Sequence, residues 1–168
     1  MSGNSVQNIS NLHNIYHEDY MVAKSQIQEH LGNIDNLDIF GREVLLAVYV
    51  RPMKSNKGVH MSAAWQREDV YQGKTALILK MGPGAFQGDE SYVKAMFGDH
   101  RPPARGDWVM VRPNDGMSVN IRGDGGTRSQ VKDFRGDDID AYGWDGWPCR
   151  IVLDEAIIGR LVKPHNVV

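Results

Sequence analysis

The feature that most constrains this fold is the apolar run "EVLLAVYV" at residues 43–50, which Pro52 stops. A run of this length that ends in β-branched and aromatic residues predicts a strand. The chain then turns polar and basic in "RPMKSNKGVHM", and more than twenty residues pass before the next strand pattern. Since a strand of a small domain ordinarily gives way to a tight turn, this long loop requires an explanation.

Three further segments carry strand patterns. They are "KTALILKM" (74–81), "GDWVMVRP" (106–113) and "CRIVLDEAIIGRLV" (149–162). The last predicts a strand, then a turn or short helix, and a final strand at 157–162. Glycines and prolines fall mainly between these runs, and no helices alternate with them. The pattern therefore favours a mainly β fold, either a small barrel or a sandwich.

Residues 1–40 differ from the rest in being rich in Asn, Ser, Gln and His, without proline. Within them "EDYMVAKSQIQEHLG" predicts one helix that ends at Gly32, with its apolar side chains near one face. We expect the residues before it to order only against another surface. The predicted organisation is an N-terminal arm over 1–40 and a β-barrel domain over 41–168.

The bulk composition narrows the class of protein. Apolar residues make up 41% and charged residues 24% of the chain, which is typical of a soluble globular protein. The formal net charge of −2 gives no bulk electrostatic reason to bind nucleic acid or an acidic membrane. The first twenty residues lack a signal-peptide pattern, and the single Cys149 suits a reducing compartment. We expect a cytoplasmic protein in which Cys149 is a packed strand residue rather than a nucleophile.

Motifs for metal or phosphate chemistry are weak. "GPGAFQG" (82–88) lacks the helix pattern that a phosphate loop needs, so a turn is expected there. The stretch 135–147 spaces Asp138, Asp140 and Gly143 like a calcium loop, but Cys149 falls where the bidentate Glu of an EF-hand belongs. An irregular calcium loop stays open as an alternative to a solvated polar loop.

Two other motifs have plain interpretations. His13 and His17 have no accompanying third ligand, so no zinc site is predicted. Arg-Gly-Asp occurs at 105–107, 122–124 and 135–137, where turn residues are expected rather than adhesion motifs. We expect no catalytic residues, no cofactor and no bound metal, and hence no enzyme.

The order of the strand segments, taken together, resembles the GroES-like co-chaperonin (chaperonin-10) family. The matching pieces, in order, are "EVLLAVYVRP", the loop "MKSNKGVHMSAAWQREDVYQ", "GKTALILKMGPG", "ARGDWVMVRPNDG" and "CRIVLDEAIIGRLV". They cover about residues 42–163, interrupted by insertions at 85–104 and 119–147. The resemblance implies a small open Greek-key β-barrel with an N-terminal helical arm and two long loop insertions. The insertions and the arm suggest a divergent, virus-encoded relative.

In that family the loop, here 52–72, is mobile and docks a short apolar tripeptide onto a double-ring chaperonin, which binds the ATP. The resemblance therefore implies a chaperonin partner for Val59, His60 and Met61, with Lys57 and Gly58 in the hinge. It also implies a homo-oligomeric ring in which the first and last strands pair between neighbours. The expected assembly contacts are Val44, Leu46, Ile158, Leu161, Trp65, Trp144 and Trp147.

His60 departs from the family, whose tripeptide is wholly apolar, since burying an unpaired imidazole costs binding free energy. A second interpretation therefore stays open, a structural protein of a virus particle such as a capsid decoration, cement or connector subunit. Its contacts would be the arm, the insertions and aromatic residues on irregular segments. Those aromatic residues are Trp65, Tyr71, Tyr92, Phe97, Trp144 and Trp147. They would equally serve to cover the open ends of a barrel.

Overall fold

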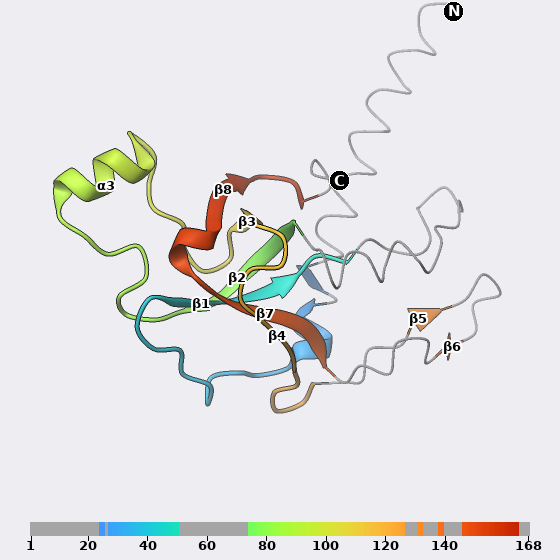
Figure 1. Cartoon of the computed structure of the whole chain (residues 1–168). Helices are drawn as coiled ribbons and strands as arrows, with labels where there is room; N and C mark the ends of the chain where they lie inside the picture. The colour runs from blue at the N-terminus through green and yellow to red at the C-terminus, as the bar shows by residue number, and fades with distance from the viewer. Residues whose placement is uncertain are drawn as a thin grey trace, which may run out of the picture.

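The structure of the chain is a computed structural model (Figure 1), which describes residues 24–25, 27–50, 74–126, 131–132, 138–139 and 146–164. The described fold is mainly β, as the sequence predicts. Its elements are β1 (Glu43–Val48), β2 (Thr75–Met81), α3 (Glu90–Phe97), β3 (Trp108–Val111), β4 (Met117–Ile121), β5 (Val131–Lys132), β6 (Asp138–Ile139), β7 (Trp147–Leu153), the 3-10 helix η1 (Asp154–Ala156) and β8 (Ile157–Leu161).

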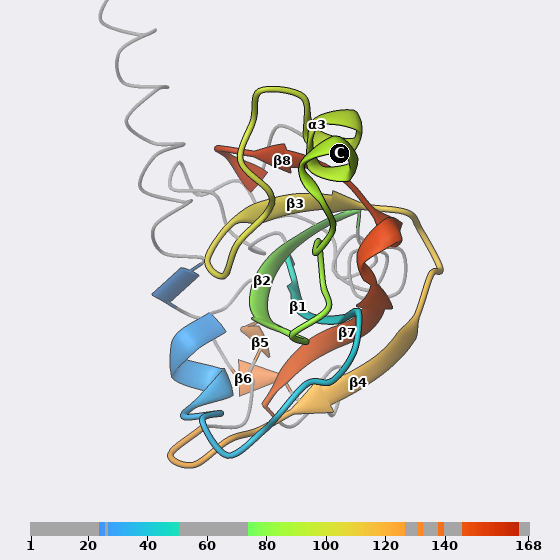
Figure 2. The same ribbon diagram turned by 90° about the vertical axis from the view of Figure 1, so that its left-hand side faces the viewer.

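Six strands form one antiparallel sheet in the order β4-β7-β1-β2-β3-β8. Figure 2 shows the sheet strongly curved, with β8 and β4 at its two ends. These two edge strands do not pair with each other, so the sheet is not closed within the described residues. The short strands β5 and β6 form a separate antiparallel pair.

Both faces of the central strands are buried. Along β1 the odd-numbered residues Leu45 and Ala47 belong to a first core cluster, and the even-numbered Val44 and Leu46 belong to a second. Because successive side chains of a strand point to opposite faces, a strand covered on both sides needs apolar residues throughout. This burial accounts for the unbroken apolar run at residues 44–50.

The first core includes residues from the predicted N-terminal arm. Ile27, Leu31 and Ile34 are buried against the same cluster as β1 and β7. Helical residues end at Leu31, and Gly32 follows with φ of 71°, its N–H donating to the carbonyl of Gln28. The predicted helix end is confirmed, and this part of the segment 1–40 packs as one of the covers of the sheet.

The second core is covered by the segment after β2 and by η1. Its members outside the sheet include Ala85, Phe86 and Ala156. Strand β2 ends at Met81 and a turn follows at residues 83–86, as predicted for "GPGAFQG". The insertion 85–104 contains α3, capped at its N-terminus by the Asp89 carboxylate, which accepts a hydrogen bond from the Tyr92 N–H. Figure 1 shows α3 standing away from the sheet.

The segment 119–147 holds a strand that the sequence patterns did not indicate. Strand β4 pairs with β7 from Met117↔Ile151 to Ile121↔Trp147 and forms an edge of the sheet. Its sequence, Met-Ser-Val-Asn-Ile, alternates apolar with polar residues and is mostly exposed or half-buried. It is an edge strand with one covered face, so polar residues alternate with apolar ones along it.

Candidate functional site

The predicted partner-binding residues Lys57, Gly58, Val59, His60 and Met61 lie outside the described residues, as do Trp65 and Trp144. The structure does describe the two points at which the segment 51–73 leaves the sheet. Strands β1 and β2 are antiparallel neighbours, with Val48 opposite Ala76, and the Tyr49 N–H donates to the Thr75 carbonyl over 3.0 Å. Both ends of the segment therefore start side by side from the centre of the sheet.

Tyr49 anchors this exit point to the core. It is buried, and its ring meets the ring of Trp108 edge-on, with centroids 5.6 Å apart and planes at 81°. Edge-to-face pairs of this kind add to the stabilisation from burial alone. The point at which residues 51–73 leave the sheet is thus held by the contact between Tyr49, just after β1, and Trp108 on β3.

Val44 and Leu46, two of the predicted assembly contacts, are fully buried in the second core. Their strand β1 has β7 on one side and β2 on the other. Both edges of β1 are therefore paired with other strands of the same chain. Neither the Val44 nor the Leu46 side chain is exposed for contact with another copy. Strand β1 therefore has no unpaired edge to offer another copy.

The last strand, β8, does lie at a sheet edge. Ile158 is 58% exposed, whereas Leu161 is half-buried and packs on the first core. Val162, the residue after β8, is 81% exposed. Exposed apolar side chains along a strand with one unpaired edge make β8 the strongest candidate in the described residues for a contact with another chain.

Trp147 lies on β7 rather than on a loop. Its indole N–H donates to the carbonyl of Val48 over 2.8 Å, and its ring stacks on His30 with centroids 5.9 Å apart. With only 6% of its surface exposed, it joins the N-terminal segment to the sheet. In this structure it serves as an internal anchor, the role that sequence reasoning left open for the aromatic residues.

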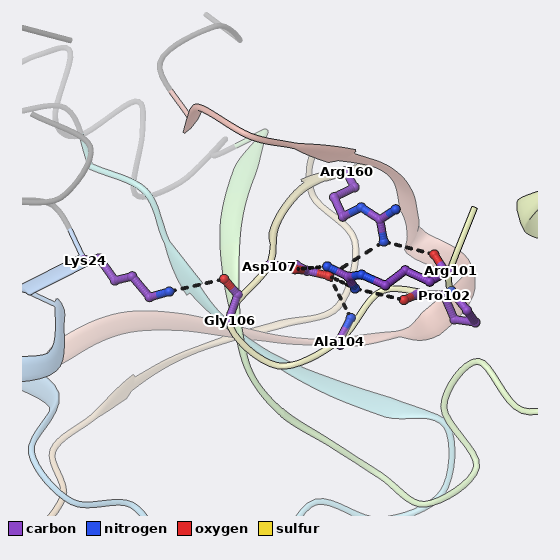
Figure 3. A network of polar contacts seen from close by, with 7 residues as sticks. All are labelled: Lys24, Arg101, Pro102, Ala104, Gly106, Asp107 and Arg160. Carbon is purple, nitrogen blue, oxygen red and sulfur yellow. Dashed lines mark hydrogen bonds and ion pairs between the residues drawn. The ribbon is translucent and has the colours of Figure 1, made fainter. Parts of the chain in front are cut away.

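An ion-pair cluster joins the α3–β3 segment to the edge strand (Figure 3). Asp107 accepts two hydrogen bonds from the Arg101 guanidinium, at 2.7 and 2.8 Å, and one from the Ala104 N–H at 2.9 Å. Arg160 on β8 reaches across, with its Nη1 2.9 Å from the Arg101 carbonyl and 3.8 Å from Asp107 Oδ2. The pKa of Asp107 is lowered, and the hydrogen bond from the Arg101 guanidinium is the largest cause.

The same cluster includes one of the three Arg-Gly-Asp motifs. In residues 105–107 the carboxylate of Asp107 is engaged within the chain, and the Gly106 carbonyl accepts a hydrogen bond from Lys24 Nζ at 3.4 Å. In residues 122–124, Arg122 donates to the Gly126 carbonyl and Asp124 forms a bridge with Asn33. Arg105 and Gly106 lie in a turn, as predicted, whereas Asp124 of the second motif forms a β-bridge, and residues 135–137 lie outside the described residues.

Strand β7 carries a buried arginine that the sequence patterns did not single out. Arg150 donates hydrogen bonds to the carbonyls of Arg112 and Asp115, and burial lowers the pKa of its guanidinium. It thereby holds the turn between β3 and β4 onto the sheet. An arginine within an otherwise apolar strand is the signal that could have indicated this role.

No nucleophile or metal site emerges from the described residues. Cys149 is buried on β7, as predicted, and its burial raises the pKa of the thiol to about 12, so the reactive thiolate is suppressed. Within the described ranges no three His, Cys, Asp or Glu side chains gather where they could hold a metal ion. The calcium-loop candidates Asp140 and Gly143, and His13 with His17, lie outside those ranges.

Comparison of the chain with models of known protein families and with curated protein sequences finds no match. In the part of the chain that the structure describes, no helix is long and apolar enough to cross a membrane.

Proposed function

We propose that this chain is a non-catalytic, ring-forming co-chaperonin that caps a double-ring chaperonin through its 52–72 loop and assists protein folding. Its domain would be a divergent GroES-like open Greek-key barrel, and ATP would be bound by the partner. The observation that carries the proposal is the exit geometry of this loop. Val48 lies opposite Ala76 at the centre of the sheet, so both ends of the loop are held at one place.

This geometry suits a tethered peptide ligand. A segment whose two ends leave a buried core side by side would offer its middle, Val59-His60-Met61 in the sequence, without displacing the sheet. A short apolar peptide that orders on binding has a low affinity by itself. Several such peptides on one ring gain through effective concentration, which gives firm capping with reversible single contacts.

The open sheet supports the homo-oligomeric part of the proposal. Both edge strands, β4 and β8, have one unpaired side in the described residues, and β8 exposes Ile158. Natural proteins protect such edges, and pairing with neighbouring copies is one way of covering them. A contact between different edges of successive copies closes into a ring when its rotation permits.

A structural protein of a virus particle on the same barrel is the second candidate. The segments that a minimal barrel does not need, which are helix α3 and the N-terminal segment, favour this candidate. Helix α3 has no buried residue, and Ile27, Leu31 and Ile34 are integrated into the core. Such additions provide surfaces for fixed neighbours, and a shared fold does not carry a shared function.

The test is sedimentation of the purified protein, alone and with a bacterial double-ring chaperonin plus ATP. We expect an oligomer that co-sediments with the chaperonin. The double variant Val59→Asp/Met61→Asp should abolish co-sedimentation while leaving the oligomer intact. Ser55→Asp/Ser62→Asp, which adds the same charges to the same loop but keeps the apolar residues, should bind nearly as well as the unmodified protein.

His60 provides a second comparison. His60→Val should strengthen chaperonin binding, because it removes the desolvation cost of a polar ring in an apolar groove. A folded oligomer that does not bind the chaperonin, with or without His60→Val, would overturn the co-chaperonin proposal in favour of the structural one.

A further inference from the structure

Helix α3 is too short to be stable without packing, yet it buries no residue. An isolated helix in water is marginal below about 12–15 residues, and α3 spans eight, Glu90–Phe97. Its anchor is Phe97, whose ring meets Phe86 edge-on with centroids 5.9 Å apart. Met96, one position before it, is 55% exposed. The helix therefore presents apolar surface that an additional contact would cover.

The outward face of β8 is the matching surface. Leu161 packs on the first core, so the alternation of a strand places Arg160 and Val162 on the opposite, outward face. Ile158, beside the register shift between β3 and β8, is strongly exposed, as is Val162. Exposed apolar side chains therefore lie before and after Arg160 along the chain.

The charges around the two surfaces are complementary. Asp89 and Glu90 stand at the start of α3 and Asp99 follows its end, against a single Lys94 within it. At β8, Arg160 lies beside Arg101, and the one carboxylate that both approach is Asp107. Two guanidinium groups around one carboxylate leave an excess positive charge at β8. Acidic and basic surfaces of this kind favour one docking partner over others.

The two surfaces do not cover each other within one chain. Figure 1 shows α3 projecting away from the sheet, whereas β8 lies within it. We propose that α3 of one copy packs on the outward face of β8, residues 158–162, of the next copy. The inference rests on the homo-oligomer in the proposed function and adds to it a contact between different surfaces of successive copies. A contact of that type repeats from copy to copy and closes into a ring or continues as a chain.

Two single variants test the contact by sedimentation velocity at micromolar concentration. Met96→Asp removes the α3 surface and Val162→Asp removes the β8 surface, and both positions are exposed, so folding should persist. Each variant alone should sediment as a monomer. Phe40→Asp is the matched control, since it adds the same charge to a side chain that is 76% exposed elsewhere on the molecule, and it should assemble normally.

Mixing the two variants gives the sharper result. The Met96→Asp protein retains β8 and the Val162→Asp protein retains α3, so an equimolar mixture should form a dimer and nothing larger. Circular dichroism confirms that each variant is folded. Normal assembly of the Met96→Asp protein, or no dimer in the mixture, would overturn the inference.

These outcomes are separable from failure of the proposed function. If the unmodified protein forms an oligomer that both variants retain, the inference fails while the co-chaperonin proposal stands on its own binding test. If the unmodified protein is a folded monomer, the α3–β8 contact and the ring both fail.

Discussion

The buried carboxylate of Asp154 is held by Arg42, which donates to it through Nη2 at 2.7 Å and through Nε at 3.3 Å. The same carboxylate accepts a hydrogen bond from the Phe86 N–H at 2.9 Å. Phe86 has a φ of 56°, a conformation that costs a bulky residue about 1–2 kcal/mol. Asp154 thus ties the start of β1 and the turn after β2 to η1, and compensates for the strain at Phe86.

Replacing Asp154 should destabilise the fold. In Asp154→Ala the Phe86 N–H loses its acceptor within the protein, so we expect a loss of about 1–3 kcal/mol in the free energy of unfolding. The loss of the partner of Arg42 should add little, because the Arg42 side chain is 54% exposed. Urea denaturation measures the loss. Glu155→Ala is the control, because Glu155 is exposed on the same 3-10 helix, and it should change stability by less than about 0.5 kcal/mol. Equal effects of the two substitutions would contradict the assigned role of Asp154.

A side chain at Gly116 should destabilise the fold. Its φ is 79°, and a Cβ there would lie 2.2 Å from the carbonyl oxygen of Ile151 on β7. Gly125, with φ of 75°, has no atom within 4 Å of the same position. Gly125→Ala should therefore show only the cost of the left-handed conformation, about 1 kcal/mol. Gly116→Ala should lose about 2 kcal/mol more, since the β7 backbone must shift. Similar losses in urea denaturation would show that this turn does not approach β7 so closely.

The ion pair between Asp107 and Arg101 should make stability depend on pH in the acid range. Because the pKa of Asp107 is lowered in the folded state, its contribution is present above the unfolded pKa, near 3.8, and is lost as the pH falls through the folded value. The stability difference between the unmodified protein and Asp107→Asn should therefore be full at pH 6 and shrink towards pH 2. Asp99→Asn, a substitution at an exposed position in the same segment, is the control and should change stability by less than about 0.5 kcal/mol. A constant Asp107→Asn difference across this range would argue against the ion pair.

Cys149 should be inert in the folded protein. With the pKa of the buried thiol raised to about 12, the thiolate fraction at pH 8 is about one in ten thousand, and the thiolate is the reactive form. A disulfide reagent at pH 8 should label Cys149 only after denaturation. The raised pKa also means that its contribution to stability is complete below the unfolded value, near 9, and is lost as the pH rises towards 12. Rapid labelling of the native protein would show that β7 opens or that Cys149 is accessible.

Local sequence determined much of this fold. The apolar runs specified β1, β2, β3 and β7, because a buried strand needs apolar side chains. Such a run can be recognised from neighbouring residues alone. Gly32 specified a helix end, and the sequence also placed η1 and β8 after β7. Each of these features depends on a few neighbouring residues.

The tertiary structure decided which surfaces are available. From sequence, Val44 and Leu46 were as suitable for a contact between copies as Ile158, since all three are apolar strand residues. Strand order places β1 at the centre of the sheet and β8 at its edge, so Ile158 alone of the three is exposed. Strand order depends on pairings between residues far apart in the chain, which local patterns do not encode.

The polar contacts show the same division. Arg42 and Asp154 are separated by 112 positions, and Trp147 reaches Val48 across 99. No spacing in the sequence relates such pairs. Only folding brings them together, because the carboxylate and the indole N–H find their partners where the sheet and its covers meet. The sequence by itself determined the strands and the helix end, and the tertiary structure determined the edges and the polar contacts that join distant segments.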